Sequence, residues 1–372
     1  MLYASCFMRV GIDGSRAFLK QRTGIEEYSY QVIKHLRGKI KKTSRVVLYL
    51  RRGQVVDFGL SAGETGLPKN WRIKVLRWPR FWTQFGLSLE MLFHPVDVLF
   101  IPAHIAPLIH PEKTFVVVHG VEYEIIKEAY SFLGRFYMRH SIKLSCRWAK
   151  KIIAVSKNTK KDLVELYKIP ENKIEVIYEG VSIEEGPKYT GQYDKYKPYF
   201  LFIGWLGVRK NVLGMISAFE ILKERYNIPH KLILAGQAGF KYQEIRERID
   251  KNVYKEDIVE LSFVDKEHKG NLIRNAEVFL FPTFYEGFGL PILEAQILGV
   301  PVVTSNISSL PEVGGDSVAY ATPTEPIGIA DSIYKLISDD NFKNAIIEKG
   351  YENVKKFSWD KCSREIAKVI LN

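Results

Sequence analysis

Hydrophobic residues along this chain fall into short runs that alternate with longer amphipathic stretches. The runs are rich in β-branched residues, and a loop with glycine or charged residues follows each one. In the first half of the chain they cover residues 9–13, 46–50, 73–78, 97–101, 115–119, 151–155 and 174–178, and in the second half 199–204, 232–235, 258–263, 278–281 and 301–304. Because βαβ units produce this alternation, the pattern predicts parallel sheets.

A polar stretch from residue 184 to 199 separates the two series of runs and has no hydrophobic period. At 372 residues the chain also exceeds the size at which a single hydrophobic core stops growing. We therefore predict an α/β protein with two doubly wound parallel-sheet domains, at residues 1–184 and 185–358, that face each other across a cleft.

Composition excludes several classes of protein. Hydrophobic residues make up 46% and charged residues 26% of the chain, which is typical of a globular protein. The longest apolar neighbourhood, residues 85–109, contains Glu90, His94 and Asp97 and is no candidate for a membrane-spanning helix. The three cysteines are far apart and lack zinc or redox spacing, so we expect a reduced, cytoplasmic protein.

The positive net charge of +12 is concentrated in the first half of the chain. Residues 1–190 contain 31 Lys and Arg against 18 Asp and Glu, whereas residues 191–372 contain 23 against 24. This asymmetry favours an acidic partner for the first half: nucleic acid, an anionic lipid surface or a phosphorylated ligand. A solvated basic surface on an otherwise neutral enzyme is the alternative.

A predicted helix at residues 125–151, interrupted near Gly134, fits the lipid interpretation. Apolar and aromatic residues recur on it at helical spacing, beside a ridge of four cations. The ridge consists of Arg135, Arg139, Lys143 and Arg147. This pattern predicts peripheral contact with an anionic membrane, at its inner face. An amphipathic helix packed on its own sheet shows the same pattern.

Unusual residues gather directly after the predicted strands of the second domain. In open parallel sheets, ligands bind beyond the carboxyl ends of the strands, where helix N-termini point their free amides. The loops in question are residues 204–211, 236–239, 264–266, 282–294 and 305–312. Their position predicts that the second domain binds a nucleotide.

The segment from Glu286 to Glu294 carries the most specific chemistry. Gly287 and Gly289 permit a tight backbone, and Pro291 suits the first position of a helix. We expect a short helix that begins at Gly289, with Glu294 in its first turn. The free amides at the start of a helix favour an anion such as a diphosphate. Two carboxylates that flank this helix start are suited to hold hydroxyls on either side of the diphosphate. Alternatively, Glu294 only complements the helix dipole and Glu286 is a solvated loop residue.

This segment closely resembles the Glu-x7-Glu motif of the retaining glycosyltransferases of family 4, whose GT-B fold consists of two facing Rossmann-like domains. Other segments agree with that family in order and spacing. They are residues 11–13, 23–25, 117–120, 153–156, 173–181, 209–211, 234–236 and 310–315. The resemblance covers nearly the whole chain from Met8, and it implies a C-terminal helix, residues 359–372, that crosses back to the first domain.

The resemblance also implies roles for individual residues toward a nucleoside diphosphate sugar. Glu286 would accept hydrogen bonds from hydroxyls of the sugar and Glu294 from the ribose. Lys210, with Arg209 beside it, would neutralise the diphosphate, and His119 would face the sugar from the acceptor side. The other implied nucleotide-binding positions are Gly24, Gly204, Phe263, Val264, Phe288, Gly289 and Leu290.

One position departs from the family pattern, because Trp205 stands where many members carry Arg. This departure leaves Lys210 as the surest cation for the phosphates. Plain structural explanations also exist: Arg209 and Lys210 as a solvated basic pair, and His119 as a core histidine bonded to the backbone. A cationic pair at a helix start opposes the helix dipole unless an anion is bound.

The residues that are missing shape the predicted mechanism. None of the 13 aspartates is spaced as Asp-x-Asp, and no His or Cys cluster has the spacing of metal ligands. We therefore predict transfer of a hexose without metal or cofactor, in which the enzyme mainly stabilises charge on the departing phosphate. Similarity is closest to the mannosyl and rhamnosyl branch, so GDP-mannose is the first candidate donor, and the acceptor is a glycan or a lipid-linked molecule.

Three other functions are weighed against this one. A sugar-nucleotide epimerase or hydrolase, or a phosphorylase, would share the fold, but a phosphorylase normally needs a far longer chain and a pyridoxal lysine. A nucleic-acid-binding protein would suit the basic first half, but the chain has no RNP-like aromatic pair, zinc spacing or KH-type clamp. An NAD oxidoreductase would need G-x-G-x-x-G after a strand, which residues 11–14 and 236–239 do not supply.

Overall fold

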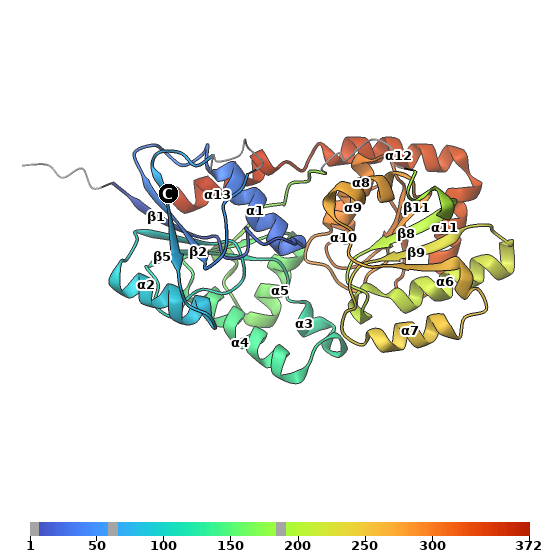
Figure 1. The fold of residues 1–372 in the computed structure, drawn as a ribbon, viewed down its shortest axis with the longest axis horizontal. Helices are drawn as coiled ribbons and strands as arrows, with labels where there is room; N and C mark the ends of the chain where they lie inside the picture. Colours follow the sequence, from blue (N-terminus) through green and yellow to red (C-terminus); the bar gives the residue numbers. More distant parts are fainter. Residues whose placement is uncertain (1–6, 59–65, 184–190) are drawn as a thin grey trace, which may run out of the picture. The chain divides into compact units, whose positions relative to one another are not determined.

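The computed structural model describes residues 7–58, 66–183 and 191–372, and the chain has two compact units (Figure 1). Unit 1 comprises Met1–Val121, Phe136–Gly180 and Ser358–Asn372. Unit 2 comprises Glu122–Arg135 and Val181–Phe357. The predicted domain boundary at residue 184 and the first part of the predicted linker lie outside the described residues.

Unit 1 is built on a sheet of seven parallel strands in the order β3-β2-β1-β4-β5-β6-β7. The strands are β1 (Arg9–Asp13), β2 (Arg45–Arg51), β3 (Trp71–Leu76), β4 (Val98–Ile101), β5 (Lys113–Val118), β6 (Lys151–Ala154) and β7 (Ile174–Val176). Its helices are α1 (Gly24–Leu36), the π-helical turn η1 (Trp82–Leu87), α2 (Ser88–Phe93), α5 (Lys157–Tyr167) and α13 (Trp359–Leu371), with most of α4 (Phe132–Trp148) and the short turn η3 (Glu171–Lys173). The strand order reverses between β1 and β4.

Unit 2 is built on a sheet of six parallel strands in the order β10-β9-β8-β11-β12-β13. The strands are β8 (Tyr199–Ile203), β9 (Lys231–Ala235), β10 (Ile258–Leu261), β11 (Val278–Phe281), β12 (Val302–Ser305) and β13 (Ala319–Ala321). Its helices are α3 (Glu122–Ile125), α6 (Val212–Tyr226), α7 (Tyr242–Asp250), α8 (Lys266–Arg274), α9 (Leu290–Ile297), α10 (Leu310–Gly314), α11 (Pro326–Ser338) and α12 (Asp340–Val354). Short turns are η2 (Lys127–Ala129), η4 (Asp194–Tyr196), η5 (Val208–Lys210) and η6 (Lys255–Asp257).

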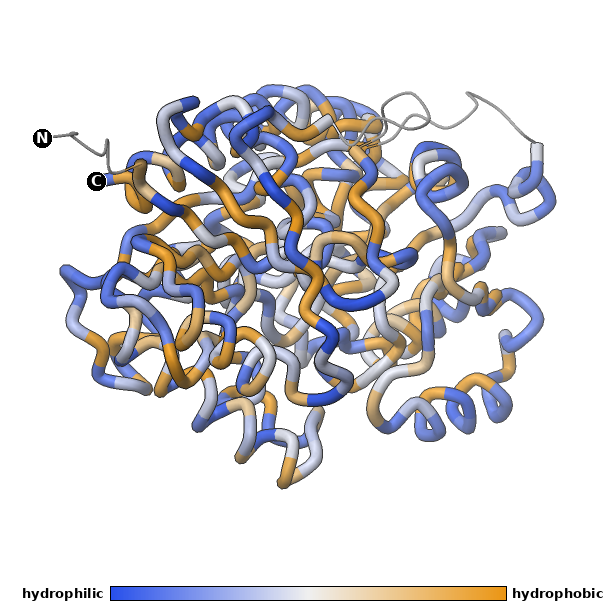
Figure 2. Tube along the Cα trace, turned by 60° about the vertical axis from the view of Figure 1, so that its left-hand side comes forward, coloured by the Kyte–Doolittle hydropathy of each residue, from blue (hydrophilic) through white to orange (hydrophobic). Residues whose placement is uncertain are grey.

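The central strands of both sheets form the cores. Every residue of β4 and of β11 is buried, as expected for parallel strands that helices cover on both faces. Figure 2 shows hydrophobic stretches running through the interior of the trace and hydrophilic stretches along its outside. The predicted parallel sheets are confirmed, and each predicted run overlaps a strand. The three-residue strand β13 was not predicted.

The C-terminal helix α13 returns to unit 1, which confirms the expected crossing. It packs on α1 through an apolar stripe that includes Cys362, Ile366 and Ile370. Just before unit 2 begins, Gly180 passes so close to the start of α13 that a Cβ on it would lie 2.1 Å from the backbone nitrogen of Trp359. A glycine is therefore required where the two chain segments pass each other.

Residues 122–135 differ from the sequence-based expectation in two ways. They were placed in the first domain, but they group with unit 2, because η2 packs against η5. The single helix predicted over residues 125–151 is also wrong: α3, η2 and α4 are separate, and the break falls before α4 rather than at Gly134. Ser131 Oγ accepts a hydrogen bond from the amide of Gly134 at 3.2 Å, so the serine caps the start of α4.

Candidate active site

The predicted cations and Glu286 lie at the carboxyl ends of two neighbouring strands of unit 2. Strand β8 precedes the loop and the turn η5 that carry Arg209 and Lys210, and β11 precedes the loop that carries Glu286. The strand order of the sheet reverses between β8 and β11. Ligands of doubly wound sheets bind at such a reversal. The topology therefore brings together residues that are 76 positions apart in the sequence.

Arg209, Lys210 and Glu286 form one cluster, in which Lys210 is buried and the other two are partly buried. Nζ of Lys210 lies 2.7 Å from Oε1 of Glu286, and Nη1 of Arg209 lies 2.8 Å from the same oxygen. Nη1 of Arg209 also donates to the carbonyl oxygen of Tyr285 at 2.8 Å, and Nζ of Lys210 lies 4.8 Å from the centre of the Phe281 ring. Lys210 is only 9% exposed, so the interpretation of a solvated basic pair does not fit this residue.

The pKa values of the cluster follow from its burial and its charges. Burial lowers the pKa of Lys210 to about 8, although the carboxylate of Glu286 opposes the shift. Burial acts to raise the pKa of Glu286, but Arg209 and Lys210 together hold that pKa below its ordinary value. Glu286 is therefore ionised at neutral pH, and Lys210 is the member of the cluster that loses its proton in mildly alkaline solution.

Residues 122–135, which group with unit 2, add a further carboxylate that acts on Arg209. Burial acts to lower the pKa of Arg209, but Glu286, and then Glu122 and Tyr130, raise it above its ordinary value. The hydroxyl of Tyr130 donates to Oε1 of Glu122 at 3.3 Å. Sequence reasoning missed Glu122 and Tyr130, because nothing in the local pattern indicates that this segment packs against η5.

Two serines after β12 fix the loop that carries Glu286. The amide of Glu286 donates to Oγ of Ser308 at 2.9 Å, and Oγ of Ser309 lies 2.6 Å from the carbonyl oxygen of Phe288. Both hydroxyls also lie within 2.9 Å of the carbonyl oxygen of Glu286. The loop after β12 was noted in the sequence, but the role of its serines was not. They hold the backbone of the motif in one conformation.

The helix α9 begins where it was expected to begin. Gly289 directly precedes it with φ of 128°, which a side chain would strain, and Pro291 lies in its first turn. The amide of Ile292 donates to the carbonyl oxygen of Gly289 at 3.0 Å, whereas the first amides of a helix, such as that of Leu290, have no acceptor within it. Glu294 is the fifth residue of α9 and lies just beyond the first turn, which corrects its expected place in that turn. Its Oε1 is 2.6 Å from Nζ of Lys269 on α8, a partner that sequence reasoning missed.

The remaining predicted nucleotide-binding positions of unit 2 lie in loops after its strands. Gly204 follows β8 and packs closely against Gly236, which follows the neighbouring strand β9. A Cβ on Gly236 would lie 1.8 Å from the carbonyl oxygen of Gly204. The side chain of Trp205 is 48% exposed, so packing in the core alone does not explain a tryptophan at this position. Phe263 and Val264 follow β10 and are half-buried in the loop before α8. Ten of the twelve predicted site residues thus belong to unit 2.

The other two predicted site residues, His119 and Gly24, belong to unit 1. Nε2 of His119 lies 2.9 Å from the carbonyl oxygen of Pro102, and Nδ1 lies 3.2 Å from Oε1 of Glu179. Because a carbonyl oxygen only accepts, Nε2 carries a proton. Burial raises the pKa of Glu179 above its ordinary value, against the opposing effect of His119. Both ring nitrogens therefore have partners inside unit 1. The contact between Nε2 and the backbone of Pro102 is the one expected of a core histidine.

Protein packing does not explain the glycine at position 24. A Cβ built on Gly24 meets no atom within 4 Å, although this residue opens α1. The helix start is fixed instead by Thr23 and Glu26, which form a capping box. The space beside Gly24 is compatible with the close approach of a ligand that the family resemblance implies.

The described residues offer neither a metal cluster nor a membrane-spanning helix. In residues 7–58, 66–183 and 191–372, no group of three or more His, Cys, Asp or Glu side chains is placed to hold a metal ion. Among the helices of these same residues, none has the length and apolar character needed to span a bilayer.

Both halves of the chain match families of known proteins. Residues 22–185 match Glycosyltransferase Family 4, and residues 189–353 match Glycosyl transferases group 1. Together with the two parallel-sheet units, these matches place the chain in the GT-B class of glycosyltransferases. The chain belongs to the family 4, group 1 glycosyltransferases.

Individual relatives agree with this assignment. The O-antigen chain mannosyltransferase B of Escherichia coli is 32% identical over 237 residues, and the match spans 62% of this chain and 62% of that protein's length. Sucrose-phosphate synthase from Thermosynechococcus elongatus superposes with a TM-score of 0.74 at 15% identity, over 97% of this chain and 98% of that one. Anabaena HepE in complex with UDP-glucose has a TM-score of 0.72 at 16% identity, over 98% and 99%. The two solved structures show a shared fold.

Proposed function

We propose that this protein moves a hexose from a nucleoside diphosphate sugar to a glycan or lipid-linked acceptor. The observation that supports the proposal best is the cluster of Arg209, Lys210 and Glu286 near the start of α9. Two cations and a helix N-terminus are complementary to a diphosphate. Membership of the glycosyltransferase family supplies the reaction class for this cluster.

The chemistry assigned to the cluster is stabilisation of charge. A diphosphate at the start of α9 would draw Lys210 and Arg209 away from Glu286, whose carboxylate would then accept hydrogen bonds from the sugar. As the glycosidic bond breaks, negative charge grows on the leaving phosphate, and the two cations stabilise it. The transfer retains the anomeric configuration, and the leaving phosphate takes the proton of the acceptor. No metal ion enters this scheme, because Lys210 and Arg209 supply the positive charge.

The proposed donor is GDP-mannose, because the relative from Escherichia coli is a mannosyltransferase. In this proposal Glu294 holds the ribose, and the backbone of Phe263 and Val264 contacts the base. A thermal-shift screen with GDP-, UDP-, ADP- and dTDP-sugars tests the assignment, since a ligand that binds only the native state raises the melting temperature. Stabilisation by GDP-mannose is expected, and stabilisation by another nucleotide sugar alone would contradict that donor.

An epimerase or hydrolase of the same fold remains the alternative reaction. Such an enzyme would convert the donor in the absence of an acceptor. Incubation of the donor with and without a glycan acceptor separates the two functions, because transfer requires the acceptor and yields a longer glycan. Rapid loss of donor without acceptor would contradict the proposal.

We also propose peripheral contact between α4 and the anionic inner face of a membrane, which places the protein in the cytoplasm. The support is the exposure of Phe132, Leu133, Phe136 and Tyr137 on the first turns of α4. Of the four predicted cations, Arg139 and Arg147 are exposed and Arg135 and Lys143 are partly covered. Nε of Arg135 donates to the carbonyl oxygen of Tyr123 at 3.0 Å.

A further inference from the structure

A second apolar surface of unit 1 lies far from α4 in the sequence. It follows the edge strand β3 and continues over η1 and α2, and we call it the aromatic face. It consists of Trp78, Phe81, Phe85, Leu89, Leu92 and Phe93. These six side chains are between 37% and 70% exposed, with Phe93 at the upper end. Exposed apolar patches of this kind mark binding surfaces in proteins.

The aromatic face is held in a fixed shape. A Cβ on Gly86 would lie 2.9 Å from Cβ of Trp78, so this glycine lets the loop after β3 pack directly on η1. Nε1 of the buried Trp82 donates to the carbonyl oxygen of Leu76 at 3.2 Å. The ring centres of Trp78 and Phe85 are 6.0 Å apart, and those of Phe81 and Phe85 are 6.1 Å apart.

The backbone is also strained at Phe81, the residue directly before η1. Phe81 has φ of 50° and is 64% exposed. For a residue with a side chain, this left-handed conformation costs about 1–2 kcal/mol. The six residues that follow form a π-helical turn, a feature that is frequent at functional sites. Because such strain persists only where the surrounding structure holds it, the exposed ring of Phe81 is fixed by the fold of unit 1.

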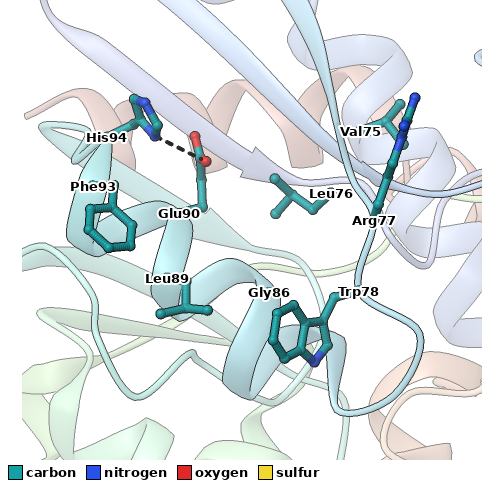
Figure 3. A pocket seen from close by; sticks show the side chains of 9 residues that line it. All are labelled: Val75, Leu76, Arg77, Trp78, Gly86, Leu89, Glu90, Phe93 and His94. Atoms are coloured by element: carbon teal, nitrogen blue, oxygen red, sulfur yellow. Dashed lines mark ion pairs between the residues drawn. The ribbon is translucent and has the colours of Figure 1, made fainter.

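An open groove runs through the aromatic face (Figure 3). Its volume is about 370 Å³. One side is formed by residues 75–78 at the end of β3 and the other by residues 86–94 of η1 and α2. The lining is mostly apolar, with Trp78, Leu89 and Phe93 among its residues. Its two acid–base groups, Glu90 and His94, lie 3.3 Å apart at one end.

The charge around the aromatic face is strongly positive. Residues 66–96 contain one carboxylate, Glu90, which is buried and lies 2.7 Å from Nζ of Lys74. The same stretch contains five cations, which are Lys69, Arg72, Lys74, Arg77 and Arg80. Except for Lys74, which is half-buried, these cations are exposed. The charge and the apolar groups together match the surface of an anionic bilayer, where aromatic rings lie at the level of the headgroups.

The aromatic face and α4 are joined through one loop of unit 1. The amide of Leu108 donates to Oγ of Ser88 on α2, and the amide of Ala106 donates to Oγ of Ser145 on α4, both at 2.9 Å. Between these two anchors, Leu108 is itself 56% exposed. This loop therefore links α2, which carries part of the aromatic face, to the C-terminal part of α4 within unit 1.

We propose that the aromatic face is the principal surface by which this protein docks on an anionic lipid bilayer, with the rings of Trp78, Phe81, Phe85 and Phe93 in the interfacial layer and Arg77 and Arg80 on the headgroups. This inference goes beyond the transfer reaction and does not depend on it. The active-site cluster lies in unit 2, so loss of docking leaves reaction with soluble substrates intact.

The test is co-sedimentation with vesicles of phosphatidylcholine that contain phosphatidylglycerol. The wild-type protein is expected to bind these vesicles, and to bind vesicles of phosphatidylcholine alone much more weakly. The triple variant Phe81→Ser/Phe85→Ser/Phe93→Ser should lose at least tenfold in vesicle binding. The variant Arg77→Gln/Arg80→Gln should lose up to about fivefold for each cation removed, and less at high salt.

A matched control replaces three exposed apolar residues of unit 2, as Phe240→Ser/Val253→Ser/Ile327→Ser. It should bind vesicles as the wild type does, and all variants should keep the melting temperature and the turnover with a soluble acceptor. The proposal is overturned if the wild-type protein does not co-sediment with anionic vesicles, or if the aromatic-face variant binds them as well as the control does. A dimer in sedimentation velocity that only the aromatic-face variant breaks, without vesicle binding, would assign the surface to a second copy of the chain.

Discussion

Lys210 and Glu286 are in direct contact, with 2.7 Å between Nζ and Oε1. Because Arg209 binds the same carboxylate oxygen, the cluster has one more positive than negative charge. This excess charge lies beside the start of α9, where an anionic ligand is favoured. Glu286 thus pairs with a buried lysine and a partly buried arginine, which the proposed function assigns to a phosphate.

Binding of a nucleoside diphosphate is predicted to weaken as the pH rises above about 8. Burial lowers the pKa of Lys210 to about 8, so the free enzyme loses this cation above that pH. A bound diphosphate favours the charged lysine, and the affinity should therefore fall by up to about tenfold per pH unit. Titration calorimetry with GDP between pH 7 and 9.5 measures the effect. The variant Lys210→Arg should bind with little pH dependence, and a flat profile for the wild type would refute the assignment.

The side chains of His119 and Glu179 are predicted to be energetically coupled in the folding of unit 1. Their side chains are 8% and 6% exposed, and Nδ1 lies 3.2 Å from Oε1. Glu179→Ala leaves the imidazole without this hydrogen-bond partner and should destabilise the protein by about 1–3 kcal/mol. Glu179→Gln retains a hydrogen-bonding group and should cost less. Urea unfolding of Glu179→Ala, of His119→Asn and of the double variant measures the coupling, which should exceed about 0.5 kcal/mol. Additive effects would show that the pair is not coupled.

The close passage of Gly180 beside Trp359 is predicted to anchor α13. Gly180→Ala puts a methyl group 2.1 Å from a backbone nitrogen that belongs to a packed helix. The helix must shift, at a cost of about 1–3 kcal/mol or more. Gly38→Ala is the control, because a Cβ at this exposed position meets no atom within 4 Å. Thermal unfolding should separate the two variants, and equal melting temperatures would contradict the role given to Gly180.

Transfer is predicted to continue in the presence of EDTA. The cations of Lys210 and Arg209 take the place of a metal ion in the proposed mechanism. A transfer assay with and without chelator measures this directly. Activity that is lost with EDTA and restored by manganese or magnesium would require a revised mechanism.

Parallel sheets were predictable from the sequence, because each buried strand is a continuous apolar run. The motif around Glu286 was predictable as well, since glycine and proline positions determine where α9 begins. The sequence also fixes Glu294 as the fifth residue of a helix that begins at Leu290, so its place beyond the first turn was predictable and the expectation of a first-turn position was wrong. The pairing of Lys210 with Glu286 was beyond sequence reasoning, because only the strand order brings the loops after β8 and β11 together.

The aromatic face shows a second limit of sequence reasoning. Residues 73–93 have the apolar content of a buried segment, and nothing in the pattern tells which side chains stay exposed. The exposed side chains lie on the loop after β3, on η1 and on α2, so their exposure depends on how these elements pack on unit 1. The grouping of residues 122–135 with unit 2 likewise depends on tertiary contacts between η2 and η5.

The most direct test of the proposed function is the steady-state turnover of GDP-mannose and acceptor by Lys210→Ala beside the wild type. Removal of a group that stabilises charge in the transition state should lower kcat by about a hundredfold or more. Arg209 still pairs with Glu286 in this variant, so the fold should persist, which circular dichroism verifies. A folded Lys210→Ala variant with turnover near that of the wild type would contradict the account.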